Sequence, residues 1–432
     1  MNTVKKITAI ALAAAIASSA VVMTACDKNI NEEKENTSQV STEESSKADE
    51  DKVEESSETI EDISAITSKS EITKEQLSNI DNFITQHKSI PSFTIKGDPI
   101  DAAAISKNKK LTFIPDNSNN VFTALVTDQF KKASANVGLT GLTADDSDGT
   151  PSYYNAQLEN ARKDSDLIVM YGDINKDPLA TNIELAQASG VEVISAGFVG
   201  DDAKDHYVDY TIPIDYQLAG KLLADWAISK NKGKVNALAI NNSDSTVSTS
   251  VYKGFTAEFV NFVTEGYCTV LSGASIETGN GLATKIKQAL EKDPNLNYIV
   301  VLDETMINDT LSAVEQSGKN IKVISTGGST SAFSSVENGK LDMLVAQSFE
   351  WTAYAMLDYS LRVLGDQKLP DIQSVPVRVV TADSIKNDLE NTEYEEIDGF
   401  YEICFGANFI TGYRKLWGIA DGGEGDGDET DE

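Results

Sequence analysis

The polar loop between Asp116 and Phe122 is the stretch whose residue types best suit ligand binding. It follows a short apolar run, Leu111 to Ile114, that indicates a buried strand, and Pro115 ends that run. Asparagine and aspartate side chains in such a loop favour turns and helix N-caps. Apolar residues from Val121 to Phe130 then recur at helical spacing. Because open α/β sheets bind ligands beyond the carboxyl ends of their strands, we expect this loop to touch a ligand.

The sequence offers little for catalysis or for metal binding. It contains three cysteines and two histidines, and His87 and His206 lie far apart without a partner pattern. No CxxC or HExxH motif occurs, and no GxSxG, P-loop or GxGxxG motif follows a strand. Asp303 and Glu304 are adjacent acids on one loop, and adjacent carboxylates need not converge as glycoside hydrolysis requires. We therefore predict a protein that is not an enzyme and that uses no metal and no cofactor.

Apolar runs and helical patterns alternate along most of the chain. This alternation predicts parallel sheets with helices on both faces, which is the α/β class. The pattern restarts near Pro213, so two doubly wound parallel-sheet lobes are expected. The clearest strands are predicted at residues 111–114, 166–171, 191–195, 235–240, 298–302 and 321–325.

The N-terminus has the pattern of an export signal. Lys5 and Lys6 precede an apolar, alanine-rich run from Ile7 to Met23, which is short for a membrane span. The sequence Met23-Thr24-Ala25-Cys26 resembles the lipobox of bacterial lipoproteins. The resemblance implies a signal peptide at 1–25, cleavage before Cys26 and lipidation of that cysteine. We therefore expect an extracytoplasmic protein that is lipid-anchored to the outer face of the bacterial cell membrane.

Charge is concentrated toward the two ends of the chain. The net charge of −32 makes nucleic acid an unsuitable partner, because the phosphate backbone repels an acidic surface. Residues 27–70 hold 14 acids against five lysines and almost no aromatic residue, and the last residues are Gly, Asp and Glu. We predict an acidic disordered tether at 26–73, an appended helix and lead-in at 74–105, and an acidic disordered tail at 418–432.

The order and spacing of five segments make the chain resemble the type I periplasmic binding proteins, in particular their ribose- and galactose-binding members. The resemblance implies two lobes joined by a three-strand hinge that closes on a ligand. One lobe would comprise 106–213 plus 348–375, and the other 214–347 plus 376–417. The segments that carry the resemblance are Ile114 to Phe122, Asp215 to Gly220, Lys253-Gly254-Phe255, Asp303 to Met306, and Asn338 to Gln347.

The resemblance also implies a set of ligand-binding residues. Aromatic faces and planar amides or carboxylates are the groups that a sugar site needs. For Phe122 and Trp351 plain core packing is the alternative role, and for Asp303 a helix N-cap is. By family position the ligand-binding residues are Asn117, Asn119, Phe122, Asp173, Phe198, Asp244, Asp303, Gln347 and Trp351.

The function implied by the resemblance is that of a monomeric solute-binding lipoprotein, which captures a small ligand, a sugar, between its lobes and delivers it to an ABC permease. A ligand-sensing lipoprotein that acts on a signalling partner is the alternative. Gly197-Phe198 replaces an aspartate-arginine pair of the family, and Gly327 replaces an aspartate. These departures leave a nucleoside or another non-sugar metabolite open as the ligand. Cys268 and Cys404 could pair after export or remain free and buried.

Overall fold

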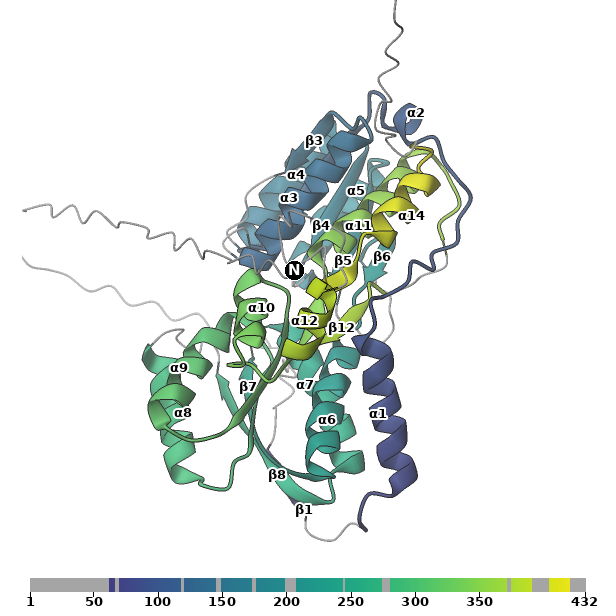
Figure 1. The fold of residues 1–432 in the computed structure, drawn as a ribbon. Helices are drawn as coiled ribbons and strands as arrows, with labels where there is room; N and C mark the ends of the chain where they lie inside the picture. Colours follow the sequence, from purple (N-terminus) through teal and green to yellow (C-terminus); the bar gives the residue numbers. More distant parts are fainter. Residues whose placement is uncertain are drawn as a thin grey trace, which may run out of the picture. The chain divides into compact units, whose positions relative to one another are not determined.

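The strands of this chain form two separate sheets within one compact unit, Thr59–Glu432 (Figure 1). The predicted α/β class and the two-lobe organisation are confirmed. The predicted signal peptide, Cys26, His206 and residues 420–432 of the predicted acidic tail lie outside the residues that are described. The computed structural model describes residues 62–66, 70–117, 120–144, 149–172, 176–198, 207–243, 245–273, 280–370, 374–390 and 404–419.

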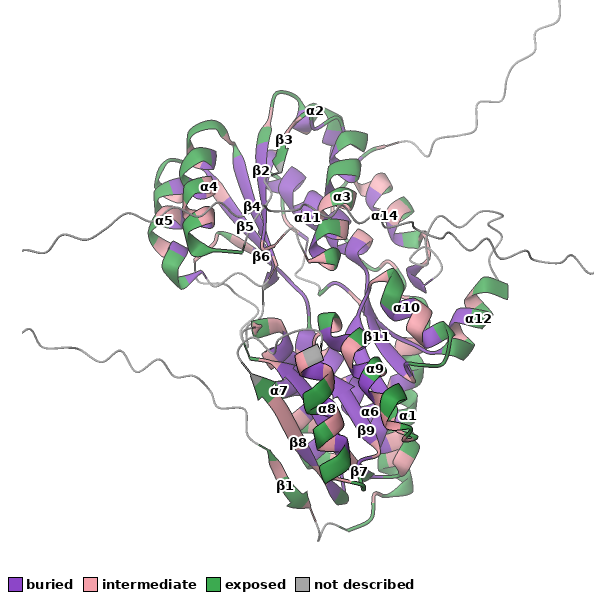
Figure 2. Cartoon of the chain, turned by 90° about the vertical axis from the view of Figure 1, so that its left-hand side faces the viewer, coloured by how far each residue is buried: buried purple, intermediate pink, exposed green. Residues whose placement is uncertain are grey.

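The first lobe is built on a five-stranded sheet with the order β3-β2-β4-β5-β6, in which every neighbouring pair is parallel. All five residues of β4 are buried, as expected for a strand covered on both faces (Figure 2). The strands are β2 (Lys110–Pro115), β3 (Gly141–Ala144), β4 (Leu167–Tyr171), β5 (Glu192–Phe198) and β6 (Tyr210–Pro213). The helical segments are α2 (Ala102–Ser106), α3 (Val121–Asn136), α4 (Pro151–Asp164), η1 (Asp177–Leu179), α5 (Ala180–Ala188) and α11 (Phe349–Leu364).

The second lobe is built on a seven-stranded sheet with the order β1-β8-β7-β9-β10-β11-β12. The inner pairs are parallel, and both edge strands, β1 and β12, are antiparallel to their neighbours. The strands are β1 (Ile63–Ile66), β7 (Lys234–Asn242), β8 (Glu265–Gly273), β9 (Tyr298–Val301), β10 (Lys322–Gly327), β11 (Met343–Gln347) and β12 (Val377–Val380). The helical segments are α1 (Lys74–Lys88), α6 (Tyr216–Asn231), α7 (Thr246–Phe262), α8 (Asn280–Lys292), η2 (Glu304–Met306), α9 (Ile307–Ser317), α10 (Thr330–Glu337) and α12 (Ala382–Glu390).

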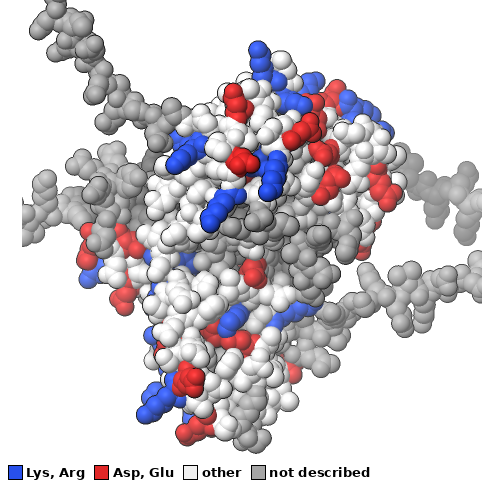
Figure 3. Space-filling view, turned by 90° about the vertical axis from the view of Figure 1, so that its right-hand side faces the viewer, with Lys and Arg blue, Asp and Glu red and all other residues white. Residues whose placement is uncertain are grey.

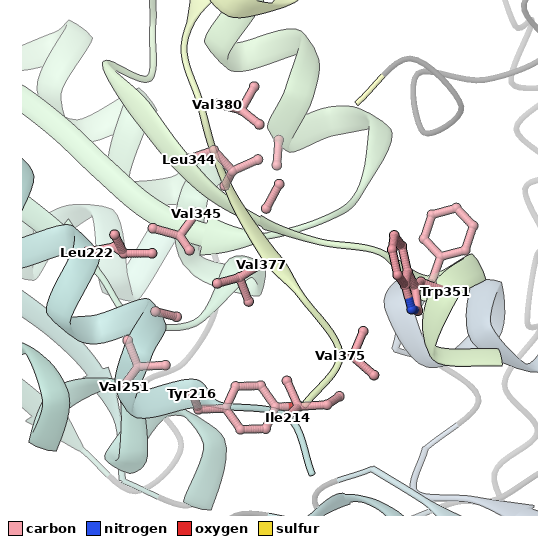
Figure 4. Packing of buried hydrophobic residues seen from close by; sticks show 14 of the residues in the cluster. Ile214, Tyr216, Leu222, Val251, Leu344, Val345, Trp351, Val375, Val377 and Val380 are labelled. Carbon is pink, nitrogen blue, oxygen red and sulfur yellow. The ribbon is translucent and has the colours of Figure 1, made fainter. Parts of the chain in front are cut away.

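Three passes of the chain within residues 210–380 form the hinge between the lobes, as the resemblance implied. The first runs from β6 into α6, the second from β11 into α11, and the third from α11 into β12. The first and third passes lie side by side, since Ile214 pairs with Val375 and the Val375 N–H donates to the Pro213 carbonyl at 3.2 Å. Figure 4 shows Ile214, Tyr216 and Val375 together at this point.

The structure differs from the predicted tether at its C-terminal end. Ile63–Ile66 forms β1, which pairs with β8, and the Asp62 carboxylate accepts a hydrogen bond from the Val270 N–H at 2.7 Å. The edge of β8 offers unpaired backbone groups, and two isoleucines in an otherwise acidic segment supply a short strand for it. Thr73 then begins α1 with a capping box that includes Gln76.

The last described helix, α14 (Asn408–Leu416), also differs from the expectation. The resemblance implies that residues 376–417 belong to the second lobe, but α14 packs against α11 of the first lobe. Its aromatic residues explain the placement, because Phe409 stacks on Trp351 with ring centroids 4.5 Å apart. Helix α1, whose docking the sequence left open, contacts α6 and β12. Cys268 and Cys404 are both buried and unpaired.

Candidate functional site

A cavity of about 740 Å³ lies where the carboxyl ends of strands from both sheets meet. The first lobe contributes the ends of β2 and β4 and the start of α3, and the second lobe contributes the ends of β7, β9, β10 and β11. This is the position at which α/β sheets bind ligands. Its volume falls in the usual range for a small-molecule site. The polar side chains that line it include Asn117, Asn120, Asn242, Ser245, Ser248, Asp303, Thr305, Asn308, Thr326, Ser329 and Gln347.

The β2–α3 loop is held by two of its own side chains. The Asp116 carboxylate accepts hydrogen bonds from the Asn117 N–H at 2.6 Å and the Thr123 hydroxyl at 2.8 Å. Asn120 caps α3, since its side-chain oxygen accepts from the Phe122 N–H at 2.9 Å. With Asp116 and Asn120 holding the loop in this way, Asn117 and Phe122 line the cavity. The loop therefore lies where a ligand in the cavity could reach it, and its contact with a ligand stays a prediction.

On the opposite wall, Asp303 and Gln347 are held by neighbouring polar groups of the second lobe. One carboxylate oxygen of Asp303 accepts from the Asn242 amide at 3.0 Å, and the other accepts from the N–H and the hydroxyl of Thr305. Asp303 therefore does cap η2, yet it also lines the cavity. The Gln347 amide donates to the Thr326 hydroxyl at 3.4 Å, and its side chain is 8% exposed.

Glu304 is a site residue that the sequence interpretation did not select. Its buried carboxylate accepts hydrogen bonds from the backbone N–H groups of Gly328 at 2.9 Å and Ser329 at 2.7 Å. Burial raises the pKa of Glu304, while these N–H donors and the nearby Ser329 side chain act to lower it. Glu304 thus fixes the loop that follows β10. The signal for this role in the sequence is an acid shortly after β9, Glu304, combined with the pair Gly327-Gly328 at the end of the next strand, β10.

The two glycines of that loop permit close approaches that no larger residue would. Gly327 has φ +154°, and a Cβ there would lie 2.6 Å from the Glu304 carboxyl carbon. A Cβ on Gly328 would lie 2.5 Å from the Gln347 carbonyl oxygen and 2.6 Å from the Phe122 ring. Phe122 belongs to the first lobe and Gly328 to the second, so this ring contact spans the cavity from one lobe to the other.

Among the described lining residues, carboxylates are present and no lysine, arginine or histidine is. Asp116, Asp303 and Glu304 carry the acidic groups, and Phe122, Tyr171 and Tyr216 carry the aromatic faces. Burial raises the pKa of Tyr171 well above its usual value, so this side chain stays neutral. Such a lining offers hydrogen-bond acceptors and amide donors without a cation to attract an anionic ligand.

The predicted site residues fall into three groups. Asn117, Phe122, Asp303 and Gln347 line the cavity. Trp351 does not, because it is 3% exposed and stacks on Phe409, and Figure 4 shows it beyond the segment that carries Val375. Its packing alternative therefore accounts for it. Phe198 ends β5, where only its backbone is described. The remaining predicted residues, Asn119, Asp173 and Asp244, lie outside the described residues.

The described residues contain neither a metal-binding cluster nor a helix that could span a membrane. Within the described ranges, no cluster of three or more His, Cys, Asp or Glu side chains has the geometry to hold a metal ion. A search of the same residues found no helix of the length and apolar character that a bilayer crossing demands. Figure 3 shows acidic and basic side chains mixed over one face of the molecule.

Residues 111–368 match the family model of the periplasmic binding protein domain. This span includes both sheets apart from β1 and β12. The ribose import binding protein RbsB of Bacillus subtilis (strain 168) is 23% identical over 236 residues, which cover 52% of this chain and 75% of that protein.

Solved structures show the same fold. A periplasmic solute-binding protein of an ABC transporter from Actinobacillus succinogenes 130z, with bound D-allose, has a TM-score of 0.58 at 16% identity and covers 65% of this chain and 100% of its own. A solute-binding protein from Bacillus halodurans C-125 with bound myo-inositol has a TM-score of 0.57 at 16% identity, covering 65% and 97%. About a third of this chain therefore lies outside the part that these two structures match.

Proposed function

This chain belongs to the periplasmic binding protein domain family, and from that premise we propose that it captures a neutral, polyhydroxylated small molecule, a sugar or cyclic polyol, between its two lobes. The observation that carries the proposal is the cavity at the strand ends, lined from both lobes by amides, hydroxyls, carboxylates and an aromatic ring, with no basic side chain among its described lining residues. The bound D-allose and myo-inositol of the structural relatives support the same ligand class.

Each wall would recognise the ligand in a different way. Asn117 and Phe122 of the first lobe supply an amide and an apolar ring, while Asp303 and Gln347 of the second supply acceptors and an amide. Vicinal hydroxyls pair well with carboxylates and planar amides, and the C–H face of a pyranose or inositol ring suits an aromatic surface. A ligand that touches both walls stabilises the closed arrangement of the lobes.

A thermal-shift screen tests the ligand class. D-Ribose, D-allose and myo-inositol form one arm, adenosine and uridine the second, and ribose 5-phosphate the third. A ligand that binds only the folded state adds about 2.7 kcal/mol of stability at a hundred times its Kd. We expect a rise in Tm in the first arm and none with the phosphate. A rise with nucleosides alone would favour the nucleoside alternative, and a rise with the phosphate alone would refute a site for neutral polyols.

The wider role that we propose is delivery of this ligand to an ABC permease by a monomer anchored through a lipid on Cys26. The family match and the export-signal pattern of residues 1–26 support it. Acyl chains hold a protein on a bilayer when more than one is attached. Replacing Cys26 with serine should therefore move the exported protein from the membrane fraction to the medium, and retention of the variant on the membrane would contradict the anchor.

Ligand sensing through a signalling partner remains the second candidate. It uses the same cavity and the same closure, and it differs in what reads the closed form. Uptake of a radiolabelled ligand by cells that lack this protein distinguishes the two roles. Loss of uptake supports delivery, whereas full uptake with loss of a ligand-dependent transcriptional response supports sensing.

A further inference from the structure

Two segments that flank the family-matched region meet on the hinge. One is Lys88–Asp101, which leads from α1 on the second lobe to α2 on the first, and Figure 1 shows it running between these helices. The other is Cys404–Trp417, which contains α14. They are joined by backbone hydrogen bonds, from the Ile100 N–H to the Leu416 carbonyl at 2.7 Å and from the Ala102 N–H to the Trp417 carbonyl at 3.2 Å. We call these two segments together the strap.

Arg378 attaches the strap to the second lobe. This residue lies on β12 and is 2% exposed. Its Nε donates to the Lys88 carbonyl at 2.8 Å, and one of its terminal nitrogens donates to the Cys404 carbonyl. Its two terminal nitrogens also donate to the Asp388 carboxylate at 2.7 and 3.1 Å. One buried guanidinium therefore holds the start of both strap segments.

Arg362 attaches the strap to α11, which packs on the first lobe. It is 1% exposed, and its Nη1 donates to the Asp98 carbonyl at 3.1 Å. Its Nε donates to Asp358 at 2.9 Å, and the other oxygen of Asp358 accepts from the Trp417 indole at 2.9 Å. Both strap segments are thus attached to this lobe through a buried ion pair. Removing one partner of such a pair leaves a buried charge uncompensated.

Between the two attachments, the strap packs on the hinge. The Phe93 ring lies 4.9 Å from the Tyr413 ring and 6.3 Å from the Trp351 ring, centroid to centroid. A Cβ on Gly412 would lie 2.2 Å from the Phe93 ring, so the approach is close. Ser92, Thr94 and Ile95 line a cavity of about 80 Å³ together with Ile212, Val375 and Pro376 of the crossing segments.

We propose that the strap restrains the opening of the two lobes. It is attached to both lobes and packed along the crossing segments, so rotation at the hinge must displace it. Displacement would separate the Phe93, Trp351 and Tyr413 rings or strain the hydrogen bonds of the two buried arginines, and both changes cost free energy. The restraint does not depend on the identity of the ligand, so it stands or falls separately from the proposed function.

The test is a distance between the lobes, measured by pulsed electron paramagnetic resonance on the full chain without ligand. Spin labels are placed on Leu185→Cys of α5 and Val260→Cys of α7, whose native side chains are 44% and 43% exposed. Cys26 is replaced by serine. Burial raises the pKa of both Cys268 and Cys404 to about 12, so these thiols do not compete for the label.

Phe93→Ala removes the ring at the centre of the strap, and Gly412→Val displaces it, since a Cβ there would lie 2.2 Å from the ring. We expect each to add a population at longer distance that the wild type lacks. Phe83→Ala is the matched control, because this ring is also on the appended N-terminal region, and its ring contacts with His87 and Lys221 lie within the second lobe. It should leave the distances unchanged.

Unchanged distances in Phe93→Ala and Gly412→Val, with circular dichroism showing both folded, would overturn the proposal. A shift of the same size in Phe83→Ala would overturn it too, because general loosening would then explain the result. Should either variant unfold, Phe93→Leu retains apolar volume without the ring and is subject to the same two criteria.

Discussion

The cleft and the strap side of the hinge join the same two lobes in opposite ways. At the cleft, Asp116 makes its hydrogen bonds within the first lobe, and Asp303 and Glu304 make theirs within the second. The contact of Phe122 with Gly328 spans the cleft, and it is apolar. On the strap side, Arg362 and Arg378 are buried and bind segments far apart in the sequence.

This difference matches the two roles that we propose for these regions. Surfaces that separate and rejoin would leave any buried charge without its partner at each opening. An apolar contact, such as that of the Phe122 ring with Gly328, avoids this cost. Surfaces that stay joined can use buried, charge-assisted hydrogen bonds, which fix geometry closely. The contrast therefore predicts that substitutions on the strap side change stability, and that substitutions at the cleft change ligand binding.

The largest expected effect is the loss of stability in Arg362→Met. The substitution leaves Asp358 buried without its cation and removes the donor to the Asp98 carbonyl. We expect the free energy of unfolding to fall by about 3–5 kcal/mol, measured by urea denaturation. Lys163→Met breaks an ion pair of the same i,i+4 spacing with Glu159 on the exposed surface of α4 and should change little. Equal effects of the two variants would break the comparison.

Trp351→Ala separates the packing role of this residue from a binding role. The side chain is 3% exposed and packs against Phe409 and Phe93. We expect a loss of about 3–5 kcal/mol in stability with less than a tenfold change in ligand Kd at 25 °C. Denaturation and calorimetry measure the two quantities. Abolished binding with little loss of stability would return Trp351 to the ligand site.

Gly328→Ala should weaken ligand binding as well as stability. Its Cβ would approach the Phe122 ring of the first lobe to 2.6 Å and the Gln347 backbone carbonyl of its own lobe to 2.5 Å. The clash with Phe122 acts where the lobes meet and the clash with Gln347 acts within the second lobe, so we expect both quantities to change. Overpacking of this kind costs about 1–3 kcal/mol, which corresponds to roughly a fivefold to hundredfold rise in Kd. Calorimetry and urea denaturation measure the two quantities, and a loss of stability without a change in Kd would contradict the assignment to the cleft.

The sequence was sufficient to predict the elements that bring the site together. The runs Leu111–Ile114 and Tyr298–Leu302 are apolar and flanked by polar loops, so their strands could be predicted from local pattern alone. Asn117 and Asp303 both follow the end of such a strand, but it was the resemblance to the family that implied them as ligand-binding residues.

The strap could not be predicted in the same way. Phe409, Tyr413 and Trp417 recur at helical spacing. The rings that they pack on, Trp351 and Tyr354, lie far away in the sequence, and local periodicity does not reveal which helix an aromatic stripe will cover. Because the partner of Trp351 in this stack, Phe409, is distant in the sequence, the packing role of Trp351 was not evident and a ligand-binding role was predicted instead. Strand β1 was hidden because its pairing depends on the edge of β8 rather than on its own acidic segment.

A further expected effect is a pH dependence of stability that arises within the second lobe. Asp225 is fully buried and shares Lys221 with Glu258, and burial raises its pKa from 3.8 to about 7. The folded state therefore holds a proton that the unfolded state releases, so this stabilisation is complete below about pH 4 and is lost as pH rises through 7.

Asp225→Asn should remove that part of the pH dependence, a change of about 2–3 kcal/mol between pH 5 and pH 8, because each pH unit between 5 and the raised pKa contributes about 1.4 kcal/mol. Urea denaturation at both pH values measures it. Asp128→Asn, which alters an exposed partner of Lys132, is the control and should follow the wild type. A wild-type stability that rises between pH 5 and pH 8 by an amount that Asp225→Asn abolishes would show the opposite sign and contradict the assignment.

The central claim is that one ligand is held by both lobes at the strand ends. Isothermal titration calorimetry of the ligand from the thermal screen, against Asn117→Ala and Asp303→Ala, tests it most directly. These residues lie on opposite walls of the cavity. The account predicts one ligand per chain and at least a tenfold loss of affinity in each variant. Tight binding that neither substitution weakens, or that only one of them weakens, would contradict it.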